Sequence, residues 1–359
     1  RIIEMEYPSH AAAPKAASRP QGLAAKHRAS STWIMAVILA VTALFSFTLG
    51  HYHVSIQDLL ITLLSPITGE EVDSMMHNVV FRTRLPRIFV AIVIGCGLSV
   101  SGASYQGLFR NPMVSPDLLG ASAGAGLGAA LGLLFDFSSI GIQLCAFALG
   151  IVAVVMSVGI SSAISRSSHN VLSLVLTGMV VSALFQAFIS MLKYLADPVS
   201  KLPAITFWLM GGLTNLSIQE IPPFIIPVLI GGVPLFLFRW RINTLSFGDE
   251  EARLLGIDPK KMRILVIVCS TLITAACVSV GGLISWVGLV IPHLARMIAG
   301  PNYKHLLPAS CLLGGIFLLI VDDIARSVLT SELPLSILTA VIGAPFFIYL
   351  LLKGKKAWL

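Results

Sequence analysis

The chain has 359 residues, of which 56% are hydrophobic and only 11% are charged, and its formal net charge is +7. Soluble domains carry roughly 25% charged residues, so this composition excludes a water-soluble globular protein of this length. A charge of +7 would also suit nucleic-acid binding, but Lys and Arg occur in short clusters between apolar runs. That pattern is typical of membrane topology, and we expect no nucleic-acid partner.

The two ends of the chain differ in composition from its middle. Residues 1–32 are polar, basic and rich in Ala, Pro and Ser, so we expect a flexible cytoplasmic N-terminal tail. The apolar run that starts at Trp33 has no small-residue cleavage site after it, which favours a retained membrane span over a signal peptide. We therefore expect one transmembrane domain over residues 33–353 and a cytoplasmic C-terminal tail over residues 354–359.

Apolar segments of about the 20 residues that a membrane-spanning helix needs recur along the chain. Ten are found, at residues 33–50, 88–108, 118–135, 140–164, 171–193, 221–238, 263–281, 283–299, 306–321 and 335–352. The predicted fold class is all-α, a polytopic membrane protein with about ten transmembrane helices per subunit. An N-in, C-in topology places three quarters of the 24 Lys and Arg residues in inside segments, as the retention of cations in cytoplasmic loops requires.

The third predicted span contains a regular series of glycines. Gly120, Gly124, Gly128 and Gly132 recur every four residues, so they share one face of a helix. In lipid, hydrophobicity does not drive helices together, and small residues let neighbouring backbones approach closely. We expect this face to pack tightly against another helix.

Motifs for catalysis and for metal binding are absent from the sequence. There is no G-x-x-x-x-G-K-[ST] loop to hold phosphates, so we do not expect the chain to hydrolyse ATP. The adjacent Asp322 and Asp323 point about 100° apart on a helix, which is a poor arrangement for sharing a proton. The five cysteines lie inside apolar segments without CxxC or zinc-type spacing. We expect no catalytic residue, no metal and no cofactor in this chain.

Residues 243–263 form a polar stretch between the sixth and seventh predicted spans. Ser246 is a suitable N-cap for a short helix, and acidic residues follow in its first turn, where the helix dipole favours them. Gly256 can end the helix in a left-handed conformation, and Asp258 can cap the next one. We expect a short cytoplasmic helix over about residues 246–257.

This short helix would carry apolar side chains, Phe247, Leu254 and Leu255, in a cytoplasmic loop. Such a helix either packs on its own bundle or inserts into a groove of a cytosolic motor protein, as amphipathic helices do. The sequence leaves both interpretations open.

Three arginines, Arg84, Arg87 and Arg326, fall on the outside in the predicted topology, against the usual distribution of cations. A partner that presents carboxylates would explain them, because a guanidinium group suits bidentate pairing. Interfacial snorkelling, or internal pairing with Asp322 or Asp323, would explain them equally well, and both explanations stay open here.

Three blocks of sequence resemble the FecCD-type family of ABC importer permeases, which carry iron-siderophores, haem and cobalamin. They are RLPRIFVAIVIGCGLSVSGASYQGLFRNPMVSPDLLGASAGAG at residues 84–126, GGLISWVGLVIPHLARMIAG at 281–300 and VDDIARSVLTSELPLSILTAVIGAPFF at 321–347. The resemblance runs from about Arg82 to Lys353. It implies a permease domain over residues 33–353, in a multi-pass protein of the bacterial inner (plasma) membrane.

The resemblance also implies partners. We expect a homodimer in membrane lipid, two cytosolic ATPase subunits that bind ATP and Mg, and an extracytoplasmic substrate-binding protein.

The family's functional residues can be carried over to matching positions. The helix at about 246–257 becomes the coupling helix that contacts the ATPase, with candidate residues Phe247, Glu250, Glu251, Arg253, Leu254, Leu255 and Gly256. Arg84, Arg87 and Arg326 become docking residues for the binding protein. Asn111-Pro112-Met113 becomes a cytoplasmic gate, in which Met113 stands where the cobalamin permease has Leu and keeps a similar volume with more flexibility.

The expected function is translocation of a metal chelate by a permease whose motion is driven by ATP hydrolysis in partner subunits. An iron-siderophore is the leading cargo, with haem, cobalamin or a molybdate-like oxyanion as other possibilities. The alternative is an ion-gradient-driven secondary transporter or channel, although the predicted spans contain almost none of the charged relay groups typical of that class. A third class, an intramembrane enzyme, would show turnover in the isolated subunit.

Overall fold

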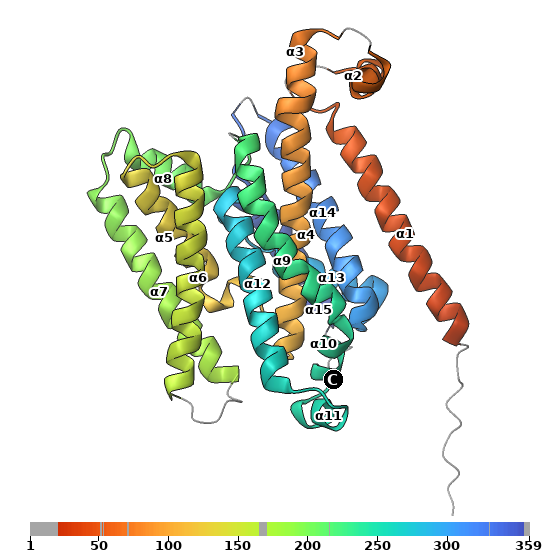
Figure 1. Cartoon of the computed structure of the whole chain (residues 1–359), viewed down its shortest axis with the longest axis vertical. Helices are drawn as coiled ribbons and strands as arrows, with labels where there is room; N and C mark the ends of the chain where they lie inside the picture. Colours follow the sequence, from red (N-terminus) through yellow and green to blue (C-terminus); the bar gives the residue numbers. More distant parts are fainter. Residues whose placement is uncertain are drawn as a thin grey trace, which may run out of the picture.

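The computed structural model of the chain describes residues 21–50, 52, 54–69, 72–164, 171–214, 216–329 and 331–354. Over these residues the chain forms helices and loops without any strand, as the predicted fold class requires (Figure 1). Most of both predicted tails, residues 1–20 and 355–359, lies outside the described residues. The elements are α1 Gln21–Ser46, α2 Ile56–Thr68, α3 Ser74–His77, the π-helical η1 Asn78–Arg84, α4 Leu85–Leu108, the 3-10 turn η2 Pro116–Leu119, α5 Ala121–Leu134, α6 Ser139–Ile164, α7 Val171–Leu195, α8 Lys201–Met210, the 3-10 turn η3 Ile218–Glu220, α9 Ile221–Leu237, α10 Arg239–Leu245, α11 Asp249–Leu254, α12 Pro259–Gly281, α13 Val287–Ala299, α14 Tyr303–Ser327 and α15 Leu335–Gly354.

Helix α4 is the central helix of the bundle, with α12, α13 and α14 packed against it (Figure 1). Most of its residues are buried. A Cβ atom on Gly95 would overlap the Gly314 carbonyl of α14, and one on Gly102 would overlap the Gly288 carbonyl of α13. Because backbones touch at these crossings, many dispersion contacts form where lipid offers no hydrophobic driving force.

The predicted glycine series forms the contact between α5 and α6, except at its first member. A Cβ atom on Gly124 or Gly128 would overlap a backbone carbonyl of α6, and Gly132 lies against Ile142 of the same helix. Gly120 instead precedes α5, has φ +89° and lies beside Ser182 of α7. Its left-handed conformation ends the turn η2, so Gly120 does not share the α5 face, contrary to the prediction.

Each of the ten predicted segments contains a helix, but only some of these helices have full membrane length. Six described helices are long and apolar enough to cross a membrane: Ser74–Leu108, Ser139–Ile164, Leu172–Leu195, Ile218–Leu237, Pro259–Gly281 and Tyr303–Ser327. The other four predicted segments contain the shorter apolar helices Ser31–Ser46, Ala121–Leu134, Val287–Ala299 and Leu335–Leu350. α5 starts late because Pro116–Leu119 forms a 3-10 turn, and α13 starts late because residues 282–286 are not helical.

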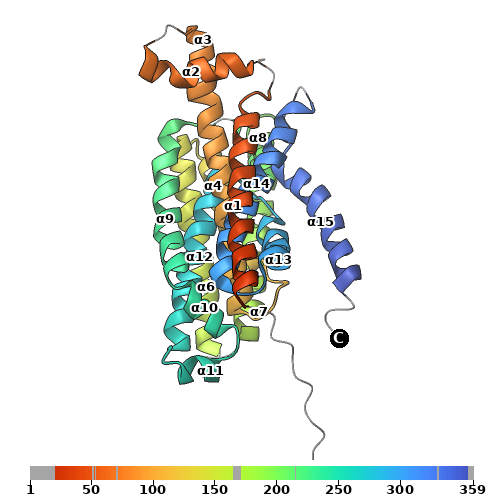
Figure 2. The same ribbon diagram turned by 90° about the vertical axis from the view of Figure 1, so that its right-hand side faces the viewer.

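The sequence did not predict α2 or α8, and α1 starts earlier than predicted, at Gln21. α2 lies across one end of the bundle and exposes Ile56, Leu60 and Leu64, and α8 lies at the same end (Figures 1 and 2). We call this the α2 end. The opposite end, where α10 and α11 lie and where the described chain starts and stops, is the α11 end.

The α5–α6 contact makes a stability prediction. Gly128→Ala should destabilise the purified protein by about 1–3 kcal/mol, seen as a lower melting temperature in detergent, because the new methyl group meets the Cys145 carbonyl. The control is Gly159→Ala on α6, where a Cβ atom meets nothing and the better helix propensity of Ala favours folding. Equal melting temperatures for the two variants would contradict the packing argument.

Candidate functional site

Among the described residues, six ionisable side chains gather at the α2 end and form a network that we call the arginine cluster. Its members are Arg84, Arg87, Asp322, Asp323, Arg326 and Glu332. The three arginines are only 4%, 7% and 5% exposed, in chain order. Buried charges are costly unless they are paired, and three formal positive charges here face three negative ones.

Arg87 contacts two carboxylates of the cluster, those of Asp322 and Glu332. Its Nη2 lies 2.9 Å from Asp322 Oδ1, its Nε 3.0 Å from Asp322 Oδ2, and its Nη1 2.7 Å from Glu332 Oε1. Glu332 also accepts a 2.8 Å hydrogen bond from the Thr214 hydroxyl. Arg87 therefore joins α4 to α14, to the loop before α15 and, through Glu332, to the loop before α9.

Arg84 and Arg326 close the C-terminal end of α1. Arg84 donates to the Phe47 carbonyl, and Arg326 donates to the Ser46 carbonyl at 2.5 Å. Arg326 also pairs with Asp323 on its own helix at 2.5 Å. The last carbonyls of a helix lack partners within it and carry partial negative charge, so cations from other helices stabilise them.

The structure thus shows internal pairing, one of the explanations that the sequence left open for these arginines. The guanidinium groups of Arg84, Arg87 and Arg326 face carboxylates and carbonyls of their own chain. Their role in docking a binding protein stays a prediction, and it would require these groups to leave their internal partners.

At the α11 end, the predicted short helix is present but is shorter and differently capped. α11 runs from Asp249 to Leu254, and its N-cap is Gly248. Ser246 follows the last turn of α10 in a helical conformation, so its prediction as the N-cap was wrong. Gly256 is left-handed, with φ +75°, and Asp258 caps α12, as the sequence predicted.

The candidate coupling residues lie on the surface of the α11 end. Phe247, Leu254 and Leu255 are 69%, 87% and 66% exposed, whereas Ala252 on the inner side of α11 is fully buried. The charged candidates Glu250, Glu251 and Arg253 are exposed as well. The large apolar side chains of this helix therefore do not pack on their own bundle.

The candidate gate residues form a tight turn after α4. Asn111 Oδ1 accepts a 2.9 Å hydrogen bond from the Met113 backbone N–H, and Arg110 before it is left-handed, with φ +50°. Met113 is 48% exposed. The turn lies near α11, because Arg110 Nη2 is 3.9 Å from Asp249 Oδ1.

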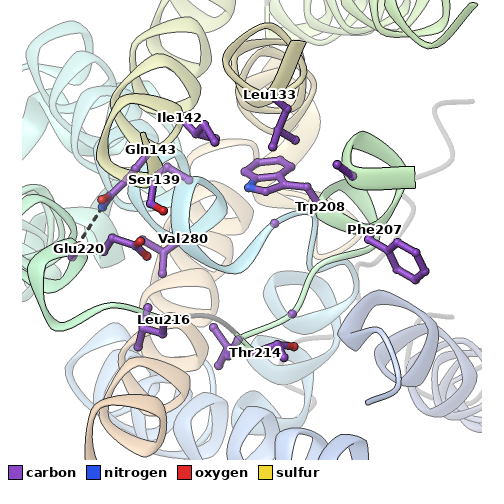
Figure 3. Close-up of a pocket in the computed structure, with 15 residues that line it drawn as sticks. Leu133, Ser139, Ile142, Gln143, Phe207, Trp208, Thr214, Leu216, Glu220 and Val280 are labelled. Carbon is purple, nitrogen blue, oxygen red and sulfur yellow. Dashed lines mark hydrogen bonds between the residues drawn. The ribbon is translucent and has the colours of Figure 1, made fainter. Parts of the chain in front are cut away.

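A cavity of about 410 Å³ opens among α5, α6, α8 and the end of α12 (Figure 3). Ser139, Gln143 and Glu220 supply polar atoms on one wall, and Trp208 lies across from them. Gln143 Nε2 donates to the Glu220 carbonyl at 3.1 Å. Within the described residues, no group of three or more His, Cys, Asp or Glu could hold a metal ion.

Glu332, Arg110 and Asp249 form ion pairs that the sequence did not predict. Asp322 and Asp323 are four and three residues before Arg326, respectively, a spacing that indicates pairing on a helix. The contact of Arg87 with Asp322 spans 235 residues, and no local signal in the sequence reports it.

The buried Arg87–Asp322 pair should be essential for stability. Arg87→Ala leaves the Asp322 carboxylate, 0% exposed, without its bidentate partner and should cost about 3–5 kcal/mol, measured by unfolding in detergent. The double variant Arg87→Met with Asp322→Asn should lose clearly less free energy of unfolding than the sum of the losses of Arg87→Met alone and Asp322→Asn alone. Strictly additive costs would show that the pair does not act as a unit.

Glu332 predicts a pH dependence. Burial opposes its ionisation, but hydrogen bonds and charge from Arg87 outweigh burial and lower the pKa of Glu332 below its ordinary value of 4.5. The stabilisation is therefore complete above pH 4.5 and is lost as the pH falls through the lowered pKa. Glu332→Gln should reduce stability at pH 7 by about 1 kcal/mol. Below pH 4.5, the melting temperature of the variant should fall less with decreasing pH than that of the unchanged protein. An equal fall of the melting temperature below pH 4.5 in both proteins would show that Glu332 does not cause the acid dependence.

Known proteins with similar sequences identify the family of this chain. The model of the FecCD transport family matches residues 38–353. The chain is 39% identical to the "Molybdate import system permease protein MolB" of Haemophilus influenzae, over 90% of this chain and 95% of that protein. It is 38% identical to a "Probable iron chelatin transport system permease protein" of Helicobacter pylori, over 92% and 98%.

A solved structure shows the same fold. It is described as an inward-facing conformation of a metal-chelate type ABC transporter, and it superposes with a TM-score of 0.82 at 37% identity, over 90% of this chain and 99% of that one. The chain therefore belongs to the FecCD transport family: it is a multi-pass membrane protein, the permease subunit of a binding-protein-dependent ABC importer, and is not itself an ATPase.

Proposed function

We propose that two copies of this chain form the translocation pathway and that α11 of each copy is gripped by one cytosolic ATPase subunit, which binds the ATP and Mg. The observation that carries the proposal is the exposure of Leu254 and Leu255, 87% and 66%, on a helix that protrudes at one end of the bundle (Figures 1 and 2). Burial of a leucine side chain contributes about 1.5–3 kcal/mol of favourable free energy, which an exposed leucine lacks. An apolar groove on a partner would supply that burial.

The same proposal assigns the sides of the membrane. With ten spans and an N-in, C-in topology, the α11 end is cytoplasmic and the α2 end faces the binding protein. Support comes from the positions of the described termini, both at the α11 end, and from the basic residues Arg239, Arg241, Lys260 and Lys261 beside α11. Trp240, 54% exposed, suits the membrane–water boundary there.

The proposed cargo is a metal chelate or a metal oxyanion, handed over at the α2 end and released past the Asn111–Met113 turn. The two relatives support this range, since one is named for molybdate and the other for iron chelatin. An iron-siderophore remains the first cargo to test. Family membership favours this mechanism over the secondary transporter or channel that the sequence left as its alternative.

Uptake into proteoliposomes tests the mechanism. The chain, the ATPase subunits and the binding protein encoded with it are reconstituted, and ⁵⁵Fe-siderophore, haem, cobalamin and ⁹⁹Mo-molybdate are offered separately. We expect uptake of one of them to require ATP and every component. Accumulation without ATPase subunits, driven by an imposed ion gradient, would instead establish the secondary transporter.

The exposed leucine makes a sharper prediction. Leu254→Asp should weaken co-purification of the ATPase subunits by about ten-fold, because a carboxylate replaces an apolar side chain in the partner's groove. The chain itself should stay folded, with an unchanged melting temperature. Ile56→Asp on α2, which is 68% exposed at the other end, is the matched control and should leave assembly intact. Normal assembly of the Leu254→Asp variant would remove α11 from the contact.

A further inference from the structure

Asp249, the first residue of α11, lies between two arginines from other parts of the chain. Its Oδ1 is 3.2 Å from Nη2 of Arg263 on α12 and 3.9 Å from Nη2 of Arg110 after α4. The side chain of Arg263 is 12% exposed and that of Arg110 is 47% exposed. Because water screens exposed pairs more strongly, the Arg263 contact is the stronger of the two and the Arg110 contact is the weaker.

The segment that follows Arg110 is held from its other side by α13. Gln106, in the last turn of α4, donates 3.3 Å hydrogen bonds from Nε2 to the Val114 and Leu289 carbonyls. Its Oε1 accepts a 2.6 Å hydrogen bond from Arg296 of α13. The turn at residues 111–113 therefore has contacts on both sides. Gln106 joins its following residue, Val114, to α13, and the ion pair between Arg110 and Asp249 joins it to α11.

We propose that Asp249 is a positioning residue that passes movement of α11 to the Asn111–Met113 turn by pulling on Arg110, while Arg263 holds Asp249 in register with α12. The inference rests on the proposed function, because it requires an ATPase subunit that moves α11. It goes beyond that function by naming the contact through which the moving helix and the turn are joined.

An ion pair suits this task physically. Two charges attract one another over a range of distances, whereas an apolar contact is lost within an ångström of separation. Arg110 sits at the start of the turn in a left-handed conformation, with φ +50°, which L side chains adopt at a cost. A change in the pull from Asp249 therefore acts on a residue whose backbone is already constrained.

We call the transmission of movement from α11 through Asp249 and Arg110 to the turn the relay. Chemical labelling of the turn tests it without knowledge of the cargo. Met113→Cys is reconstituted with the ATPase subunits, and its reaction with a membrane-impermeant maleimide is timed with and without Mg-ATP and orthovanadate. The chain that retains Met113 gives the background from the native cysteines, which lie in α4, α6, α12 and α14. We expect the vanadate-trapped complex to label at a different rate from the nucleotide-free complex.

Asp249→Asn and Arg110→Gln, each added to Met113→Cys, should reduce this nucleotide response by about five-fold or more while ATP hydrolysis continues. The double change should reduce it no further than either single change, because both remove the same pair. Asp249→Glu, which keeps the charge, should retain the response. Lys260→Gln removes a neighbouring exposed cation and should leave the response unchanged.

The outcomes separate the relay from the function beneath it. A full response in Asp249→Asn or Arg110→Gln overturns the relay. Loss of ATPase assembly in Asp249→Asn also overturns it, since Asp249 would then serve only the folding of α11. If the starting Met113→Cys complex assembles with the ATPase subunits and hydrolyses ATP but shows no change in labelling, the relay fails while the proposed function stands. If it shows no assembly with any ATPase subunit, the proposed function fails.

Discussion

Neutralisation of buried charge is the constraint on which the α2 end of this protein depends. Three arginines lie inside an apolar bundle, and each ion would cost several kcal/mol there if it stood alone. Three carboxylates and the carbonyls at the end of α1 surround them. The same contacts join α1, α4, α14 and the loop before α15, so the helices at this end are held together by charge as well as by packing.

The ion pairs of Arg87 at the α2 end and of Arg110 at the α11 end differ in length and in exposure. At the α2 end, ion pairs are short and shielded from water, and Arg87 contacts two carboxylates at once. At the α11 end, the ion pair between Arg110 and Asp249 is longer, at 3.9 Å, and the Arg110 side chain is 47% exposed. Between them, glycine contacts along α4 place backbone against backbone. The described residues therefore combine close backbone contacts at the centre of the bundle with exposed side chains at the α11 end.

Much of the fold follows from hydropathy, because every backbone polar group in lipid must be paired and a helix is the simplest way to do so. All ten apolar segments contain helices for this reason. Hydropathy does not report where a helix starts, so the late starts of α5 and α13 were missed; Pro116 and the non-helical residues 282–286 set them. Gly120 shows the same limit, since a four-residue spacing does not distinguish a helical glycine from a left-handed cap.

Whether a site residue could be predicted depended on how far away in the sequence its partner lies. Gly256 and Asp258 were predicted correctly because a cap acts within one turn of its own helix. Ser246 failed because α10 extends up to it and leaves the capping position to Gly248. The arginines that the predicted topology puts outside were recognised as exceptions to the charge rule, but their partners on α1 and α14 are set by tertiary contacts. Cations that break the distribution rule in a membrane protein therefore indicate a partner outside, an interfacial position or a carboxylate inside, and here the neighbouring Asp322 and Asp323 were the local evidence for a carboxylate inside.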